Sequence, residues 1–278
     1  QADCCLPSAA YLGLIHQPLS IMRFLFFLLA TLITLPTLAS EELLRLDTRP
    51  EVKTPIFYIK NNGASATVLL LSGGKGGMGK IVDGQPSSEN FLVRSRNHFT
   101  ENGLNVAVLG LPSDKKTGYV EYADRLSPEH LQDIKRVVEY LKTDTGLPVW
   151  LVGTSRGTVS ATAAAIDFGN ELLGGIVLTA SVVSYKKAGA VPTQDIGKIQ
   201  IPVLVVHHEK DGCVICAPHE VPSIMKGLKN TPVKKLLMVS GGENPTGDPC
   251  EALHYHGFIG IEEATVKSMA AWIKKPTL

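Results

Sequence analysis

Short apolar segments alternate with amphipathic ones along most of the chain. Segments rich in β-branched residues predict strands, at residues 52–59, 67–71, 105–109, 149–152, 176–178, 203–207 and 235–239. Helical periodicity is expected at residues 90–102, at 128–142 behind the N-cap Ser127, from about 156, and at 218–228 and 262–273. This alternation predicts an α/β fold with a mostly parallel sheet flanked by helices. The turn Asn61-Asn62-Gly63 favours an antiparallel hairpin between the first two strands.

The start of the chain has a different pattern. Met22-Arg23 precedes a dozen apolar residues, and Pro36-Thr37-Leu38-Ala39 follows them. A positive start, a short apolar stretch and small residues before a break are typical of a secretory signal peptide at residues 22–39. The stretch is shorter than the about 20 apolar residues of a membrane span, so we expect no stable membrane anchor after cleavage. Residues 1–21 are interpreted as an upstream extension or cloning remnant, which leaves residues 40–278 as a single domain.

Composition narrows the class of protein. The chain has 278 residues, 44% of them hydrophobic, and a formal net charge of +1. It can therefore bury a substantial core, and its charge gives no reason to expect a nucleic-acid partner. Three of its five cysteines follow the predicted signal peptide, so in a periplasmic or secreted protein a disulfide is expected among them.

The strongest chemical motif lies between a predicted strand and a predicted helix. It is Gly153-Thr154-Ser155-Arg156-Gly157, a Gly-x-Ser-x-Gly pattern that holds the serine on a sharp, exposed turn. A serine nucleophile needs a base and an acid, and these should follow it at the ends of later strands, the acid first. Asp211 is favoured as the acid over Glu209, because the glycine after Asp211 suits a sharp turn. His254 and His256 are both candidates for the base.

The serine motif, Asp211 and His256-Gly257-Phe258 together resemble the α/β-hydrolase superfamily, specifically its bacterial secreted esterase-like members. The resemblance covers nearly all of residues 50–275 and favours His256 over His254. It implies an eight-stranded sheet, a Ser-His-Asp triad and acyl transfer through an acyl-enzyme. It also implies an oxyanion hole made by the amide of Arg156 and one amide from the loop after the third strand.

That loop begins Ser72-Gly73-Gly74-Lys75, with a serine where many lipases have histidine. We predict the Gly74 amide as the second oxyanion donor, with Lys75 as the alternative. The stretch from Lys75 to Lys80 also resembles a deviant Walker A loop. However, Ile81 stands where a Mg²⁺-binding Ser or Thr should follow the lysine, which disfavours a nucleotide binder.

The cysteines allow two interpretations. A Cys213–Cys250 disulfide would tie the loop of the acid to the loop of the histidine, with Cys216–Cys250 as the alternative pairing. The rival is a zinc or thioredoxin-like site, whose candidate residues are Cys213, Cys216, Cys250, His207, His208 and His219. A second Cys-x-x-Cys that would support zinc is missing from the sequence, and the region from Met22 has no thioredoxin-like first βαβ unit. We therefore favour the disulfide and expect neither a metal nor another cofactor.

The sequence therefore predicts a serine esterase acting on a small-molecule ester. The segment at residues 179–201 is too short for a large cap domain, which favours short-chain or open-access substrates. Peptidase, amidase and thioesterase activity on the same triad are alternatives, as is a non-catalytic binding module. The cationic residues Lys75, Arg94, Arg96 and Arg125 are interpreted as surface charges rather than contacts to a substrate carboxylate.

Overall fold

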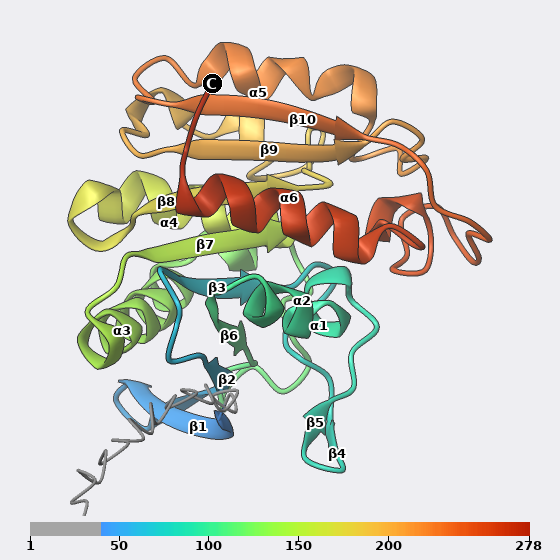
Figure 1. Cartoon of the computed structure of the whole chain (residues 1–278). Helices are drawn as coiled ribbons and strands as arrows, with labels where there is room; N and C mark the ends of the chain where they lie inside the picture. Colours follow the sequence, from blue (N-terminus) through green and yellow to red (C-terminus); the bar gives the residue numbers. More distant parts are fainter. Residues whose placement is uncertain (1–39) are drawn as a thin grey trace, which may run out of the picture. The chain divides into compact units, whose positions relative to one another are not determined.

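An eight-stranded sheet organises the part of the chain that the computed structural model describes, residues 40–278 (Figure 1). The predicted signal peptide, residues 1–21, Cys4 and Cys5 lie outside the described residues. The sheet has the order β1-β2-β6-β3-β7-β8-β9-β10. Its strands are β1 (Ser40–Arg49), β2 (Val52–Lys60), β3 (Thr67–Leu71), β6 (Asn105–Leu109), β7 (Val149–Thr154), β8 (Gly175–Thr179), β9 (Val203–His208) and β10 (Lys234–Val239).

Strand direction within this sheet is mixed only at one end. From β6 to β10 every neighbouring pair is parallel, whereas β1 pairs with β2, and β2 with β6, in the antiparallel sense. The mostly parallel eight-stranded sheet predicted from the sequence is thus confirmed.

Helices cover both faces of the sheet, so its central strands are buried on both sides. One core layer packs the sheet against α3 (Pro128–Thr145), α4 (Gly157–Leu172) and α5 (Pro222–Gly227). The other packs it against α1 (Phe91–Arg94), α2 (Arg96–Glu101) and α6 (Glu262–Lys274). The side chains of β3 alternate between the layers: Leu69 and Leu71 face the first, and Val68 and Leu70 the second.

The predicted hairpin between the first two apolar segments is wrong. β6 lies between β2 and β3, and β2 takes β1 as its other neighbour. The Asn61 turn does form, with its side chain accepting from the Gly63 amide, but the chain after it crosses to the far side of β6. A local turn motif determines where the chain changes direction, but it does not determine which strand pairs with which in the sheet.

Two predicted helices are broken. Residues 90–102 form α1 and α2, separated at Ser95, and residues 218–228 form a 3₁₀ turn (Pro218–Glu220) followed by α5. Pro222 at the start of α5 explains the second break, because proline has no N–H and so cannot donate the helical hydrogen bond to the Pro218 carbonyl. α3 begins as expected, with the Ser127 side chain accepting from the His130 amide.

The connection between β8 and β9 carries no cap domain. Its regular structure consists of two 3₁₀ turns, Val191–Thr193 and Ile196–Lys198. A two-stranded hairpin, β4 (Ile81–Val82) with β5 (Gln85–Pro86), follows the loop after β3. Among residues 40–278, no helix combines the length and apolar character needed to cross a bilayer.

Candidate active site

Ser155 stands on a tight turn between β7 and α4. Its φ is +51°, in the left-handed region that a residue with a Cβ enters only at a cost. The two glycines of the motif are required by close approach: a Cβ on Gly153 would lie 2.6 Å from the Gly157 carbonyl oxygen, and one on Gly157 would lie 2.0 Å from that of Leu71. The turn therefore presses α4 against β3 and leaves Ser155 partly exposed at the carboxyl end of the sheet.

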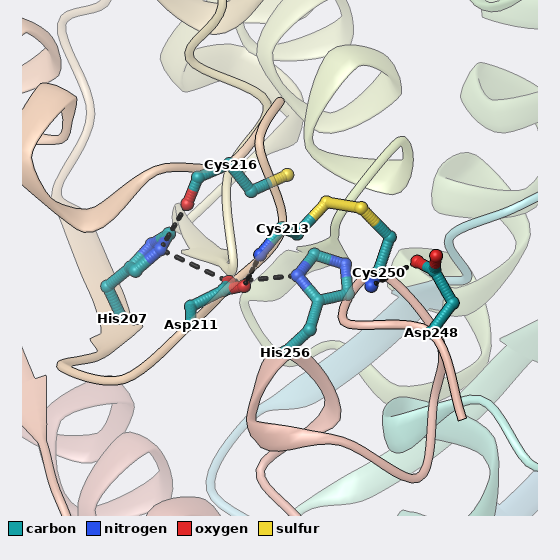
Figure 2. The surroundings of a disulfide bond; sticks show 7 residues. All are labelled: His207, Asp211, Cys213, Cys216, Asp248, Cys250 and His256. Atoms are coloured by element: carbon teal, nitrogen blue, oxygen red, sulfur yellow. Dashed lines mark hydrogen bonds and ion pairs between the residues drawn. A yellow bond between two sulfur atoms is a disulfide. The ribbon is translucent and has the colours of Figure 1, made fainter. Parts of the chain in front are cut away.

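Asp211 and His256 meet at the same end of the sheet. Asp211 follows β9, and His256 lies in the 3₁₀ turn Tyr255–Gly257 after β10. His256 Nδ1 lies 2.8 Å from Asp211 Oδ2, and both side chains are buried (Figure 2). Asp211 Oδ1 accepts from the Cys213 amide at 2.9 Å, which fixes the carboxylate in its loop.

The Asp211 carboxylate is held in its charged form. Burial acts against the charge, but hydrogen bonds from His207 and His256 outweigh it and lower the pKa of Asp211 to about 2. His207 Nε2 lies 3.3 Å from Asp211 Oδ2 and 2.7 Å from the Cys216 carbonyl oxygen. Asp211 can thus orient His256 and stabilise a positive charge on its ring.

Ser155 and His256 line one pocket of about 430 Å³. His256 Nε2 is buried and, within residues 40–278, has no hydrogen-bond partner. The Ser155 hydroxyl shares the pocket with this nitrogen but is not bonded to it. The pocket is lined by Gly73, Gly74, Lys75, Gly76, Ser88, Glu89, Asn90, Phe91, Tyr122, Thr154, Ser155, Arg156, Ile215, Cys250, Glu251, Ala252, His256 and Gly257.

Neither rival for the acid or the base lines this pocket. Glu209 is exposed, and its backbone amide continues the sheet by donating to Val239. The His254 ring packs edge-on against Tyr255, with 5.4 Å between centroids. The structure therefore brings Ser155, Asp211 and His256 together and leaves Glu209 and His254 outside.

The predicted oxyanion donors come from the glycine-rich loop after β3 and from the start of α4. Gly74, Lys75 and Arg156 line the pocket, and a Cβ on Gly73 would lie 2.9 Å from the Ser155 Cβ. The Arg156 amide at the start of α4, and those of Gly74 and Lys75, donate to no acceptor among the described residues. Unused amides at a helix N-terminus and in a glycine-rich loop can bind a developing negative charge. After Lys80 the chain enters β4 instead of a helix, unlike the nucleotide-binding loop considered above.

Among residues 40–278, a disulfide joins Cys213 to Cys250 and leaves Cys216 as a free, buried thiol (Figure 2). Ligand atoms of Cys213, Cys216 and His256 lie within 4.8 Å of one another, but Cys213 is oxidised and cannot offer a thiolate. Burial raises the pKa of the Cys216 thiol, so this cysteine is protonated in the protein without a metal. In this oxidised form the residues do not fit the zinc site considered from the sequence.

A second cluster, of the polar side chains of Arg125, His130, Ser160 and Tyr119, packs against the glycine-rich loop. The sequence pattern does not predict this cluster. Arg125, interpreted from the sequence as a surface charge, is only 2% exposed. Its guanidinium donates to the Ser160 hydroxyl at 3.1 Å and to the carbonyl oxygens of Ser72 and Gly74, each at 3.0 Å. His130 bonds Ser160 Oγ through Nε2 at 2.9 Å and the Tyr119 hydroxyl through Nδ1 at 2.7 Å. The basic side chains in this cluster bond only to neutral groups, which the sequence pattern does not signal.

His130 gives stability a specific pH dependence. Burial, reinforced by the nearby Arg125, lowers the pKa of His130 to about 3 from its ordinary 6.5. As the pH falls, the unfolded chain gains this proton first, so the folded state loses stability between about pH 6.5 and pH 3. We expect the unfolding free energy to fall between pH 7 and pH 4 by about 3 kcal/mol more in the wild type than in His130→Gln.

Urea unfolding at each pH measures this difference. His98→Gln is the matched control for the substitution itself, because His98 is partly exposed on α2 and lies outside the cluster of Arg125, His130 and Ser160. Parallel curves for the wild type and His130→Gln would contradict the buried, neutral state of His130.

The sheet order, the serine turn and the missing cap define an α/β-hydrolase fold without a lid. Three solved structures share it. A dienelactone hydrolase from Anabaena variabilis has a TM-score of 0.61 at 16% identity, covering 84% of this chain and 97% of that one. The esterase Pf2001 from Pyrococcus furiosus has a TM-score of 0.58 at 16% identity, covering 85% and 93%. XC6422 from Xanthomonas campestris, described as a serine hydrolase without lid, has a TM-score of 0.55 at 15% identity, covering 88% and 98%.

At these identities the likeness is one of fold. No family model matches the sequence, and no curated protein matches it.

Proposed function

We propose that this protein is a serine hydrolase that cleaves carboxylic esters. The observation that carries the proposal is the arrangement at one pocket. Ser155 lies on a strained turn, beside a histidine whose Nδ1 is bonded to a buried, charged aspartate. A serine, a histidine and an oriented carboxylate arranged in this order are the parts of a nucleophilic triad. Several proteins of the same fold are described as esterases or hydrolases, which agrees with this assignment.

The proposed reaction has two acyl transfers. His256 Nε2 takes the proton of the Ser155 hydroxyl as its oxygen attacks the ester carbonyl, and Asp211 stabilises the imidazolium. The amides of Arg156 and of the glycine-rich loop, at Gly74 or Lys75, bind the oxyanion. The alcohol leaves with the proton from His256. Water then attacks the acyl-enzyme in the same way and releases the carboxylic acid.

The pocket supports small substrates. Its volume of about 430 Å³ suits a ligand of modest size, and the short β8–β9 connection leaves the serine accessible. Tyr122, Ile215 and Ala252 provide apolar surface, and Lys75, Glu89 and Glu251 bring charge to the lining. This mixture favours a short acyl group over a long alkyl chain.

The same proposal covers the compartment and the partners. The Cys213–Cys250 disulfide favours an oxidising environment, as expected for a periplasmic or secreted protein. A net charge of +1 gives no support for a polyanionic partner, so the proposed partner is a small-molecule ester.

A substrate series tests the reaction class and the acyl preference. We expect kcat/KM to be highest for p-nitrophenyl acetate or butyrate and to fall by at least about tenfold toward the dodecanoate, because the pocket has a volume of only about 430 Å³ and charged side chains in its lining. The matching p-nitroanilide, a thioester and a polyester should be poorer substrates. Faster cleavage of the amide or thioester at equal acyl length would reassign the protein to amidases or thioesterases.

A further inference from the structure

Arg125 is a buried cation without a carboxylate partner. It lies in the 3₁₀ turn Ala123–Leu126, and no ion pair among the described residues includes it. Its guanidinium carbon lies 5.2 Å from the centroid of the Tyr119 ring. Burial lowers the pKa of Arg125 to about 10, so the group remains charged at neutral pH. Burying a charge costs several kcal/mol even after relaxation, so its hydrogen bonds must offset that cost.

Those hydrogen bonds fall on the glycine-rich loop beside Ser155. One guanidinium nitrogen, Nη2, donates to the carbonyl oxygens of both Ser72 and Gly74. The carbonyl oxygens of the other two residues in this stretch, Gly73 and Lys75, also accept hydrogen bonds. Gly73 accepts from the Gly76 amide, and Lys75 accepts from the Tyr119 amide, each at 2.9 Å. Every carbonyl from Ser72 to Lys75 therefore has a protein donor.

Fixing the carbonyls also fixes the amides. In a trans peptide, the carbonyl of one residue and the N–H of the next point in opposite directions. With the carbonyls of Ser72 and Gly74 turned toward Arg125, the N–H groups of Gly73 and Lys75 point away from it. Gly73, Gly74 and Lys75 line the active-site pocket, whereas Arg125, Tyr119 and Ser160 do not and instead surround a small gap of about 10 Å³. The loop thus bonds Arg125 through its Ser72 and Gly74 carbonyls, and its Gly73 and Lys75 amides remain free to face the substrate.

Without the guanidinium the Ser72 and Gly74 carbonyls lose their donor, and only the backbone bonds to the Gly73 and Lys75 carbonyls still hold the loop. Gly73 and Gly74 have no side chains to restrict their backbones, and glycine crosses easily between positive and negative φ. A flipped peptide would turn a carbonyl oxygen toward the oxyanion, where it would repel the negative charge. Hydrogen bonds from a charged donor are stronger than those from a neutral one, so two such bonds to one loop disfavour the flipped state.

We propose that Arg125 is a positioning residue of the reaction, whose buried guanidinium clamps the Ser72 and Gly74 carbonyls and so aims the Gly73 and Lys75 amides away from itself, the Lys75 amide being the one that serves the oxyanion. This inference rests on the proposed ester hydrolysis. It adds a residue that touches neither substrate nor Ser155 and yet determines the stabilisation of the transition state.

Arg125→Met and Arg125→Lys test the clamp, with Arg96→Met as the matched control. Arg96 is partly buried, less deeply than Arg125, and it also bonds a carbonyl, that of Val93, but it packs over Phe57 and does not line the pocket. We expect Arg125→Met to lower kcat for p-nitrophenyl acetate by about 10- to 100-fold, with KM changed by less than about threefold. Fluorophosphonate labelling of Ser155 should slow in parallel, because it also places an oxygen in the oxyanion hole.

The lysine variant separates positioning from folding. Lysine keeps the charge but lacks the planar fork that reaches two carbonyls and Ser160 together, so kcat should fall by about tenfold. Its melting temperature should stay within about 5 °C of the wild type. It serves as the test if Arg125→Met does not fold.

Wild-type kcat in a folded Arg125 variant, or an equal loss in Arg96→Met, would overturn the role of Arg125. If the wild type itself cleaves no ester, the proposed function fails first and this inference fails with it. If the wild type is active and the Arg125 variants match it, only the clamp is wrong.

Discussion

Replacing Ser155 by alanine should lower kcat for p-nitrophenyl acetate by at least about 10³-fold, the order of loss when a triad nucleophile is removed. Alanine keeps the Cβ and the φ of +51°, so the turn between β7 and α4 should persist. We therefore expect the circular dichroism spectrum and melting temperature to match those of the wild type. Fluorophosphonate labelling, followed by peptide mass spectrometry, should place the adduct on Ser155 in the wild type and find none in the variant.

Ser268→Ala is the control for the same substitution elsewhere. Ser268 is exposed on α6, and its hydroxyl bonds only the Ala264 carbonyl of its own helix. This variant should keep wild-type kcat and labelling. If Ser155→Ala retained more than about a tenth of wild-type kcat, Ser155 would be removed from the mechanism.

Asp211→Asn should have the second largest effect, a loss of about 10³- to 10⁴-fold in kcat at pH 7. The carboxylate accepts from His256 Nδ1 and so leaves Nε2 free to act as a base. An asparagine amide can present its NH₂ group to Nδ1, which favours the tautomer with the proton on Nε2. It also removes the negative charge that stabilises the imidazolium during proton transfer.

The matched control is Glu209→Gln, a carboxylate-to-amide change two residues earlier in the same loop. Glu209 is exposed and lies outside the pocket, so this variant should keep wild-type activity. The assignment of the acid would be reversed if Glu209→Gln lost activity and Asp211→Asn did not. Steady-state kinetics on purified, folded variants decide between the two.

Local patterns predicted the fold and the serine turn well. Gly153 and Gly157 are dictated by atoms a few residues away or on the adjoining strand, so the motif carries its own geometry. The parallel part of the sheet followed from alternation alone. β1 was missed because its sequence, SEELLRLDTR, is highly charged, and as the edge strand it has a neighbour on only one side. The hairpin failed because pairing depends on β6, more than forty residues further along the chain than the start of the turn.

The cluster behind the glycine-rich loop could not have been predicted in this way. Arg125 bonds backbone carbonyls about fifty residues earlier in the chain, and any residue type supplies such carbonyls. Similarly, His207 ends a strand like many polar residues, and only the folded chain shows that it shares the Asp211 carboxylate with His256. Burial of a charge against neutral groups has no sequence signature, because it depends on what the fold brings to it.

The disulfide has a consequence for how the site opens. Local unfolding usually proceeds loop by loop, and loops at the end of a sheet are among the first segments to open. Cys213 lies two residues after Asp211, and Cys250 lies six residues before His256, so the bond makes their two loops one covalent unit. Neither loop can swing away without drawing the other with it. The aspartate and histidine should therefore separate only in cooperative openings that involve both loops, and amide hydrogen exchange in the two should slow together when the bond forms.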